Sequence, residues 1–311
     1  MSNAEVQMGA RITGWGYKLP EKVITNDDLA QKMDTSDAWI RERTGIAKRH
    51  IGGTTSELAT EAGKAALKAS GTDAKDIGLV ILATASPDRL MPATSAKVHE
   101  QLGIQGGAFD CNAACAGFIY ALLSAYGIAD KFDTKVLLIG SDTLSRFVDE
   151  QDRQTAVLFG DGAGALVIEP DAEELILGFE AGTNGGGDNL LYIDHGDKLK
   201  MNGKEVFKQA VRSDSESIKT LFRKTSVSPK DIKLFVPHQA NIRIIEAVTS
   251  RIDIPMENTM VTISETGNTT AASIPLALAK AADENRLTRG DLILLSGFGA
   301  GMTWASVILK W

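Results

Sequence analysis

The chain repeats itself at an interval of about half its length, and this repeat limits its possible folds more than any other feature. Residues 74–80 (AKDIGLV) resemble residues 229–235 (PKDIKLF), at an offset of 155 positions (229 − 74). The apolar run at residues 136–139 recurs at residues 292–295, at an offset of 156 (292 − 136). Such matches at nearly one spacing predict two copies of one unit, which we place at residues 1–170 and 171–311.

A third match pairs Cys115, which precedes Ala-Gly-Phe, with Asn268, which precedes Thr-Thr-Ala, at an offset of 153 (268 − 115). Both residues stand where a helix is expected to begin. We therefore expect the two helix starts to face each other across one pocket, with Asn268 as the counterpart of Cys115.

Each copy alternates apolar strands with helices. A helix is expected over residues 56–70, capped by Ser56 and ended by Gly71, and a strand buried on both faces over residues 80–83. The other expected helices are 94–103, 117–132, 203–224, 241–251 and 271–285, and the other strands are 136–139, 164–168, 234–236, 292–295 and 305–309. This order predicts an α/β fold, with residues 184–200 as a loop beside a binding cleft.

Composition excludes several classes of protein. The 311 residues carry a formal net charge of −7, which argues against broad nucleic-acid binding. The sequence has neither an apolar run of the ~20 residues that cross a bilayer nor a signal-peptide core. The two cysteines, Cys111 and Cys115, are poor disulfide candidates, so we expect a cytoplasmic protein.

Cys115 lies among small residues where a strand is expected to end and a helix to begin. The positive end of a helix favours the thiolate form of a cysteine. Because a thiolate is a good nucleophile toward thioesters, this segment predicts covalent acyl transfer.

His238 and Asn268 are the candidate partners of that sulfur. His238 follows a buried strand, at the edge where α/β folds bind ligands; a hydrogen-bonded core histidine is the alternative. Asn268, in Gly-Asn-Thr, is by itself more typical of a turn or a helix cap than of a catalytic residue. The small residues at 296–303 (SGFGAGMT) predict a backbone N–H that forms an oxyanion hole with that of Cys115, within a tight hairpin.

With these motifs the chain resembles the β-ketoacyl-acyl carrier protein synthase III family of the thiolase superfamily. The likeness rests on residues 114–118 (ACAGF), 236–241 (VPHQAN) and 267–275 (GNTTAASIP) and extends from residue 11 to residue 304. It implies a thiolase-like duplicated αβαβα fold of five layers with two mixed sheets. It also implies that Cys115, His238 and Asn268 are catalytic.

The resemblance implies a decarboxylating condensation of an acyl-coenzyme A primer, most simply acetyl-coenzyme A, with malonyl-acyl carrier protein, which initiates fatty acid synthesis. The resemblance implies no metal and no redox cofactor; it implies acyl-coenzyme A and the acyl carrier protein as partners, and a homodimer. The backbone N–H groups of Cys115 and Ala300 would form the oxyanion hole. The implied binding residues are Thr35, Trp39, Arg43, Arg153, Gly203, Lys204, Asn241 and Arg243 for coenzyme A, Leu90 and Met91 for the acyl pocket, reached across the dimer, and Lys208 and Arg243 for the carrier protein.

The sequence leaves alternatives open. A related Cys-His-Asn condensing enzyme or acyltransferase of secondary metabolism shares the same three residues, and Met91 leaves the primer undetermined because methionine is adaptable. A cysteine hydrolase also uses Cys, His and Asn, but its cysteine is flanked by different residues. A non-catalytic partner subunit is disfavoured because Cys115 is present.

Overall fold

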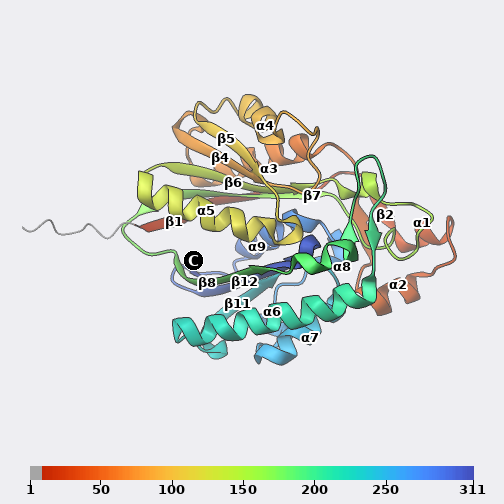
Figure 1. The fold of residues 1–311 in the computed structure, drawn as a ribbon. Helices are drawn as coiled ribbons and strands as arrows, with labels where there is room; N and C mark the ends of the chain where they lie inside the picture. The colour runs from red at the N-terminus through yellow and green to blue at the C-terminus, as the bar shows by residue number, and fades with distance from the viewer. Residues whose placement is uncertain (1–8) are drawn as a thin grey trace, which may run out of the picture.

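The computed structural model describes residues 9–311 and stacks helices and sheets in five layers (Figure 1). Helices α3 (Thr55–Ser70) and α4 (Thr94–Leu102) cover the outer face of the first sheet. Helices α5 (Gly117–Phe132) and α9 (Ser273–Asp283) fill the layer between the sheets, and α6 (Gly203–Thr225) and α7 (Ile242–Ile252) cover the outer face of the second sheet. The predicted five-layer α/β architecture is confirmed.

The first sheet has the strand order β1-β7-β6-β4-β5 and mixes directions, since β4 pairs in parallel with β5 and β6 while β7 pairs antiparallel with β1 and β6. Its strands are β1 Gly9–Lys18, β4 Ile77–Ala83, β5 Gly107–Cys111, β6 Lys135–Asp142 and β7 Gly162–Asp171. Val80 and Leu82 face the helices outside, whereas Ile81 and Ala83 face the central layer. The prediction that β4 is buried on both faces is therefore confirmed.

The second sheet repeats this pattern in the order β11-β12-β13-β8. Its strands are β8 Ile176–Thr183, β11 Ile232–Pro237, β12 Leu292–Gly299 and β13 Thr303–Lys310. β11 pairs in parallel with β12 as β4 does with β6, and both ladders shift register one residue after their start. At the edge where β5 has its place in the first sheet, Phe235 forms an isolated parallel bridge with Thr259.

The repeat also holds before the central helices, but in a different register from the predicted one. The short turn η2 (Ala114–Ala116) precedes α5, and the short turn η7 (Thr270–Ala272) precedes α9. Ala114 and Thr270, which open these turns, both have positive φ, and they lie 156 positions apart (270 − 114). Asn268 therefore corresponds to Asn112 (268 − 156), not to Cys115, and each of these asparagines accepts a hydrogen bond from the backbone N–H two residues on. The predicted equivalence of Cys115 and Asn268 is wrong.

Three layers of apolar contact hold the sheets and their helices together. The central one joins both sheets through α5 and α9, with Phe118, Ile274 and Val307 among its members. The outer two lie under α3 and α4 and under α6 and α7.

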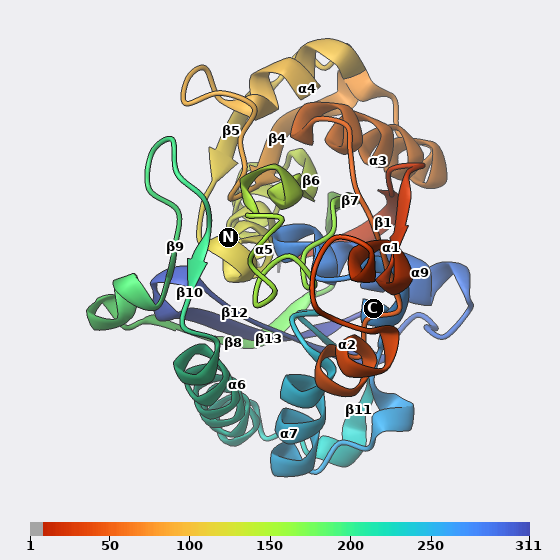
Figure 2. The ribbon, with the colours of Figure 1, turned by 90° about the vertical axis from the view of Figure 1, so that its right-hand side faces the viewer.

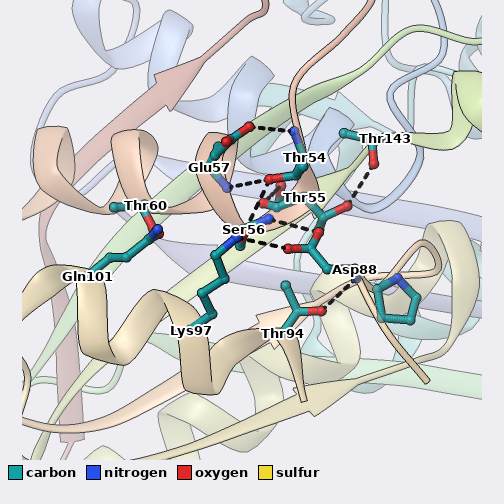
Figure 3. Close-up of polar contacts among 12 residues, drawn as sticks. Thr54, Thr55, Ser56, Glu57, Thr60, Asp88, Thr94, Lys97, Gln101 and Thr143 are labelled. Carbon is teal, nitrogen blue, oxygen red and sulfur yellow. Dashed lines mark hydrogen bonds and ion pairs between the residues drawn. The ribbon is translucent and has the colours of Figure 1, made fainter. Parts of the chain in front are cut away.

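Helix α3 begins earlier than predicted. Thr54, not Ser56, is its N-cap and forms a capping box with Glu57 (Figure 3). Just inside the helix, the buried Thr55 hydroxyl lies 2.9 Å from that of Thr143, at the end of the first sheet. Gly71 ends the helix in the left-handed conformation, as predicted.

The remaining elements are short. They are the strands β2 Val23–Thr25, β3 Lys48–His50, β9 Leu191–Tyr192 and β10 Lys200–Met201, the helices α1 Asn26–Ala30, α2 Asp37–Thr44 and α8 Ile263–Thr266, and the short turns η1 Ala74–Asp76, η3 Leu144–Phe147, η4 Gly185–Leu190, η5 Pro229–Asp231, η6 Met256–Asn258 and η8 Ala300–Met302. Residues 184–200 thus contain η4, β9 and the first residue of β10 rather than only a loop. No helix among residues 9–311 combines the length and apolar composition that crossing a bilayer needs.

Candidate active site

Cys115, His238 and Asn268 line one cavity of about 490 Å³. They come from the short turn before α5, from the residue that follows β11 and from the segment that leads into η7, and they are 7%, 6% and 6% exposed. Helices α2, α6 and α7, which also contribute to the cavity wall, lie on the side of the molecule that faces the viewer in Figure 2. The fold therefore brings together the three side chains that the sequence analysis singled out.

Cys115 lies in η2, directly before α5. A Cβ atom on Gly299 would be 2.6 Å from the Cys115 nitrogen, so the two backbones meet at a spacing that only glycine permits. Burial, helped by the charge of Asp142, raises the pKa of Cys115 to about 12. The resting group is thus the neutral thiol. The helix end alone would favour the thiolate, but the effect of burial on the pKa is larger than that of the helix.

His238 is held from both sides. Its backbone N–H donates to the Ser296 carbonyl at 2.7 Å, and its Nδ1 lies 2.6 Å from the Ser273 hydroxyl. Ser273 Oγ already accepts from the Gln239 N–H, so its own proton is free for Nδ1. We infer that Ser273 donates to Nδ1, which leaves the ring proton on Nε2. Burial lowers the pKa of His238 to about 3, so the ring is neutral at pH 7.

Asn268 has one fixed end and one open end. Its backbone is clamped between Leu158 and Gly160 by hydrogen bonds of 2.8 and 3.0 Å. Its Oδ1 accepts from the Thr270 N–H at 2.9 Å. Because that bond fixes the orientation of the amide, Nδ2 is left as a donor toward the cavity that the residue lines.

A buried carboxylate that was not predicted from the sequence joins the two halves. Asp142, at the end of β6, accepts from the hydroxyls of Thr84 (2.9 Å) and Ser86 (2.6 Å) through Oδ1. Its Oδ2 accepts from the Ala271 N–H at 3.0 Å and from the Thr270 hydroxyl. These bonds fix η7, and with it the residues that follow Asn268. The signal was a charged residue at the end of an apolar strand, where a buried carboxylate needs several donors.

Trp39, at the mouth, has two arginines over its ring. The guanidinium carbons of Arg43 and Arg153 lie 4.9 and 4.7 Å from the indole centroid. The backbone of Arg43 is held in place from outside its own helix, since the Asn241 side chain donates to the Arg43 carbonyl oxygen at 3.0 Å. A purine between Trp39 and Arg153 would need the guanidinium and the indole to be ~7 Å apart, which is two ordinary contacts of about 3.5 Å. Because they are closer than this, purine binding there requires Arg153 to move outward.

The other predicted residues divide into two groups. Gly203 and Asn241 line the cavity, as do Trp39, Arg43 and Arg153, whereas the remaining ones do not: Thr35, Leu90, Met91, Lys204, Lys208, Arg243 and Ala300. Gly299, rather than Ala300, forms the cavity wall beside Cys115.

Leu90 and Met91 project from the loop between β4 and α4 and are 86% and 81% exposed. Figure 3 shows how this loop is fixed: the Asp88 carboxylate accepts from the Ser56 N–H at 3.3 Å, and its backbone N–H donates to Thr94. The two side chains are therefore held away from the cavity of their own chain.

Further cavity residues were not predicted from the sequence. They include Phe298 of β12 and one face of α6, which consists of Val206, Phe207, Ala210 and Asp214. Their helical spacing was the available signal, since positions three and four apart share a face. Among residues 9–311, no cluster of three or more His, Cys, Asp or Glu side chains is arranged to hold a metal ion.

The chain is similar to known proteins over nearly its whole length. Residues 109–185 match the family 3-Oxoacyl-[acyl-carrier-protein (ACP)] synthase III, and residues 222–311 match 3-Oxoacyl-[acyl-carrier-protein (ACP)] synthase III C terminal. The chain is 46% identical over 310 residues to Beta-ketoacyl-[acyl-carrier-protein] synthase III 1 of Bacillus anthracis, covering 98% of this chain and 99% of that protein. The Geobacillus kaustophilus synthase III matches with the same identity and coverage.

Solved structures agree. The 3-oxoacyl-[acyl-carrier-protein] synthase III of Aquifex aeolicus superposes with a TM-score of 0.95 at 43% identity, over 97% of this chain and 100% of that one. The priming β-ketosynthase of the R1128 polyketide pathway superposes with a TM-score of 0.93 at 31% identity, over 97% and 96%. The duplicated fold, the Cys-His-Asn cavity and these matches together show that the chain belongs to the β-ketoacyl-acyl carrier protein synthase III family, the acyltransferases that initiate fatty acid synthesis.

Proposed function

We propose that Cys115 carries the acyl primer while His238 and Asn268 stabilise the enolate formed from malonyl-acyl carrier protein. The single observation that supports this division is that the three side chains line one cavity and present different chemistry there: a thiol, an Nε2–H and an amide Nδ2.

In the first stage, Cys115 Sγ forms a bond to the acyl carbon of an acyl-coenzyme A, and the bond from that carbon to the coenzyme A sulfur breaks. The thiol proton leaves with coenzyme A, so no net proton is consumed. The oxyanion that forms in between would be held by the N–H groups of Cys115 and Ala300. Because the pKa of Cys115 is raised to about 12, the sulfur loses its proton only as it attacks.

In the second stage, malonyl-acyl carrier protein loses CO₂ and leaves an enolate. His238 Nε2 and Asn268 Nδ2 would donate to the enolate oxygen. Its carbon then attacks the acyl carbonyl on Cys115, the bond to sulfur breaks, and the thiolate takes up a proton. A neutral imidazole suits this role, since its proton stays on Nε2 while it donates.

The mouth of the cavity suits coenzyme A. Arg43 and Arg153 bring positive charge beside the flat Trp39 ring, a combination that binds phosphate and purine groups. Gly203 and Asn241 line the passage inward. We assign the same ligand to Thr35, Lys204 and Arg243 at the rim.

The carrier protein would dock beside this mouth. Lys208 lies on α6 and Arg243 at the start of α7, and both side chains are about half-exposed. Each contacts a glutamate, Lys208 with Glu205 at 2.8 Å and Arg243 with Glu42 at 3.7 Å. Exposed pairs of this kind are weak, so an acidic partner can displace them.

A homodimer would explain Leu90 and Met91. Two large apolar side chains exposed on a fixed loop, next to the unpaired edge of β5, fit a second copy of the chain, whose acyl pocket they would border. The free thiols of Cys111 and Cys115 fit a reducing cytoplasm. A related condensing reaction with another primer is the second candidate, because the R1128 priming enzyme shares the fold.

Separate assays of the two stages test the division of roles. We expect Cys115→Ala to abolish acyl transfer from labelled acetyl-coenzyme A but to retain malonyl decarboxylation, and His238→Ala to do the reverse. Cys111→Ala is the matched control and should retain both. Normal decarboxylation in His238→Ala would refute its role. A panel of acyl-coenzyme A primers with malonyl-acyl carrier protein then separates fatty acid initiation from the second candidate.

A further inference from the structure

The duplication pairs Asp142 of the first sheet with Gly299 of the second. Both parallel ladders shift register after their start, and the first pair after the shift contains Val136 of β6 and Ile293 of β12. These two residues are 157 positions apart (293 − 136), and the same offset takes Asp142 to Gly299 (299 − 142). Asp142 and Gly299 therefore end equivalent strands, beside the turns that precede the central helices.

The backbone N–H groups beside these two residues have different surroundings. Gly299 has no side chain, and a Cβ there would lie 2.6 Å from the Cys115 nitrogen. The counterpart of Cys115, at the offset of 156 that the positive-φ residues set, is Ala271 (271 − 115). Here a side chain is present, since Asp142 Oδ2 accepts from the Ala271 N–H at 3.0 Å. A carboxylate oxygen of the protein thus occupies, in one half, the N–H that we assign to the reaction's oxyanion in the other.

The Asp142 carboxylate is completely buried and is bonded on both sides. Its Oδ1 accepts three hydrogen bonds from residues 84–86 of the first half, and its Oδ2 also accepts from the Thr270 hydroxyl. Thr270 is β-branched and has a φ of 52°, a conformation that such a residue keeps only where its surroundings enforce it. The Thr270 N–H in turn donates to Asn268 Oδ1 at 2.9 Å. One residue therefore connects the carboxylate to the amide of Asn268.

We propose that Asp142 is a positioning residue for malonyl decarboxylation, which acts through Thr270 to hold the Asn268 amide with Nδ2 toward the cavity. The inference rests on the proposed function, because it takes Asn268 Nδ2 to be an enolate donor. Without the carboxylate, Thr270 relaxes toward an ordinary backbone conformation, and its N–H moves away from Asn268 Oδ1. The amide is then free to turn over and to present an oxygen, instead of an N–H, to the enolate oxygen.

The first test compares the two steps in Thr270→Val, which keeps the β-branched shape and the backbone N–H but removes the hydroxyl that reaches Asp142. We expect malonyl decarboxylation to fall about 10-fold, part of the ~10²-fold that one lost oxyanion donor costs, while Cys115 is acetylated at the wild-type rate. Thr270→Ser restores the hydroxyl and should recover decarboxylation. Thr143→Val is the matched control, since it removes a buried hydroxyl next to Asp142 that lies 2.9 Å from the Thr55 hydroxyl instead (Figure 3), and both steps should be unchanged.

The second test is a double-mutant cycle. Asp142→Ala should lower decarboxylation at least as much as Thr270→Val does. The double variant Asp142→Ala/Asn268→Ala should be no slower than Asn268→Ala alone, because residues that act as one unit are not additive. Acetylation of Cys115 should not fall, since the charge of Asp142 raises the pKa of that thiol. Thr270→Val replaces Asp142→Ala in the cycle if the alanine variant does not fold.

Losses that multiply in the double variant would overturn the inference alone, and so would an equal fall of both steps, or of neither, in Thr270→Val. Wild-type decarboxylation in Asn268→Ala alone would instead overturn the role that the proposed function gives to Asn268, and this inference with it.

Discussion

Gly299 sets the position of the catalytic sulfur, and replacing it with alanine should reveal how tightly. The added Cβ would lie 2.6 Å from the Cys115 nitrogen, 3.1 Å from the Ala114 Cβ and 3.2 Å from the Cys115 Cβ. An ordinary contact begins near 3.4 Å, so the Cys115 backbone must retreat by about 0.8 Å (3.4 − 2.6). Two backbone segments meet here, and neither can give way as a flexible side chain would.

Two measurable effects follow for Gly299→Ala. Overpacking of this kind costs about 1–3 kcal/mol of folding free energy, which lowers the melting temperature by a few degrees. A displacement close to 1 Å at a reacting group costs on the order of 10²-fold in rate. We therefore expect the rate of Cys115 acetylation by acetyl-coenzyme A, followed by mass spectrometry, to fall about 10²-fold.

Gly117→Ala is the matched control on the other side of the same cysteine. Its Cβ would lie 3.8 Å from Ala83 Cβ and 3.9 Å from the Cys111 carbonyl oxygen, which are ordinary contacts. Its backbone is already helical, so alanine should gain up to ~1 kcal/mol of stability and retain activity. Wild-type acetylation in Gly299→Ala, at an unchanged melting temperature, would refute the reasoning.

Three further predictions address the polar groups of the cavity. Asn268→Ala removes one of two enolate donors, so malonyl decarboxylation should fall ~10²-fold while acetylation of Cys115 stays within about threefold; equal losses in both would contradict the assignment. Ser273→Ala removes the bond that keeps the His238 proton on Nε2, so decarboxylation should fall about 10-fold with an unchanged melting temperature and recover in Ser273→Thr; a change in melting temperature alone would mean that Ser273 only packs. The pKa of Asp214 is raised to about 7 from 3.8, so the unfolded chain gives up a proton that the folded one retains, and this residue costs stability as pH rises from about 4 to about 7. The free energy of unfolding of Asp214→Leu, relative to that of the wild type, should therefore rise across that window by up to ~4 kcal/mol ((7 − 3.8) × 1.36). Urea unfolding at pH 4.5 and at pH 8 measures this difference, and a difference independent of pH would argue against the raised pKa.

Much of the fold could be predicted because the repeated segments are buried strands, whose continuous apolar runs are recognisable in the sequence. The matching runs at residues 74–80 and 229–235 form the same turn and strand in both sheets, with the same register shift. Strands β1 and β8, at sheet edges, were not predicted, since their exposed faces break the apolar run. The division near residue 170 stays a prediction.

The catalytic residues could be predicted, but their equivalence could not. Cys115 was matched with Asn268 because both precede small residues at a helix start, whereas the positive-φ residues Ala114 and Thr270 show the true register. Only coordinates reveal that register. Long-range burial likewise decided the protonation of Cys115, and the burial of Asp142 and Asp214 depends on neighbours that are distant in the sequence.

The acetyl adduct on the protein tests the central claim most directly. Wild-type protein is incubated with labelled acetyl-coenzyme A, digested and sequenced by mass spectrometry. The account predicts one label on Cys115, released when malonyl-acyl carrier protein is added, with Cys111 unlabelled although it is the less buried thiol. A label on Cys111, or none on either cysteine, would contradict it.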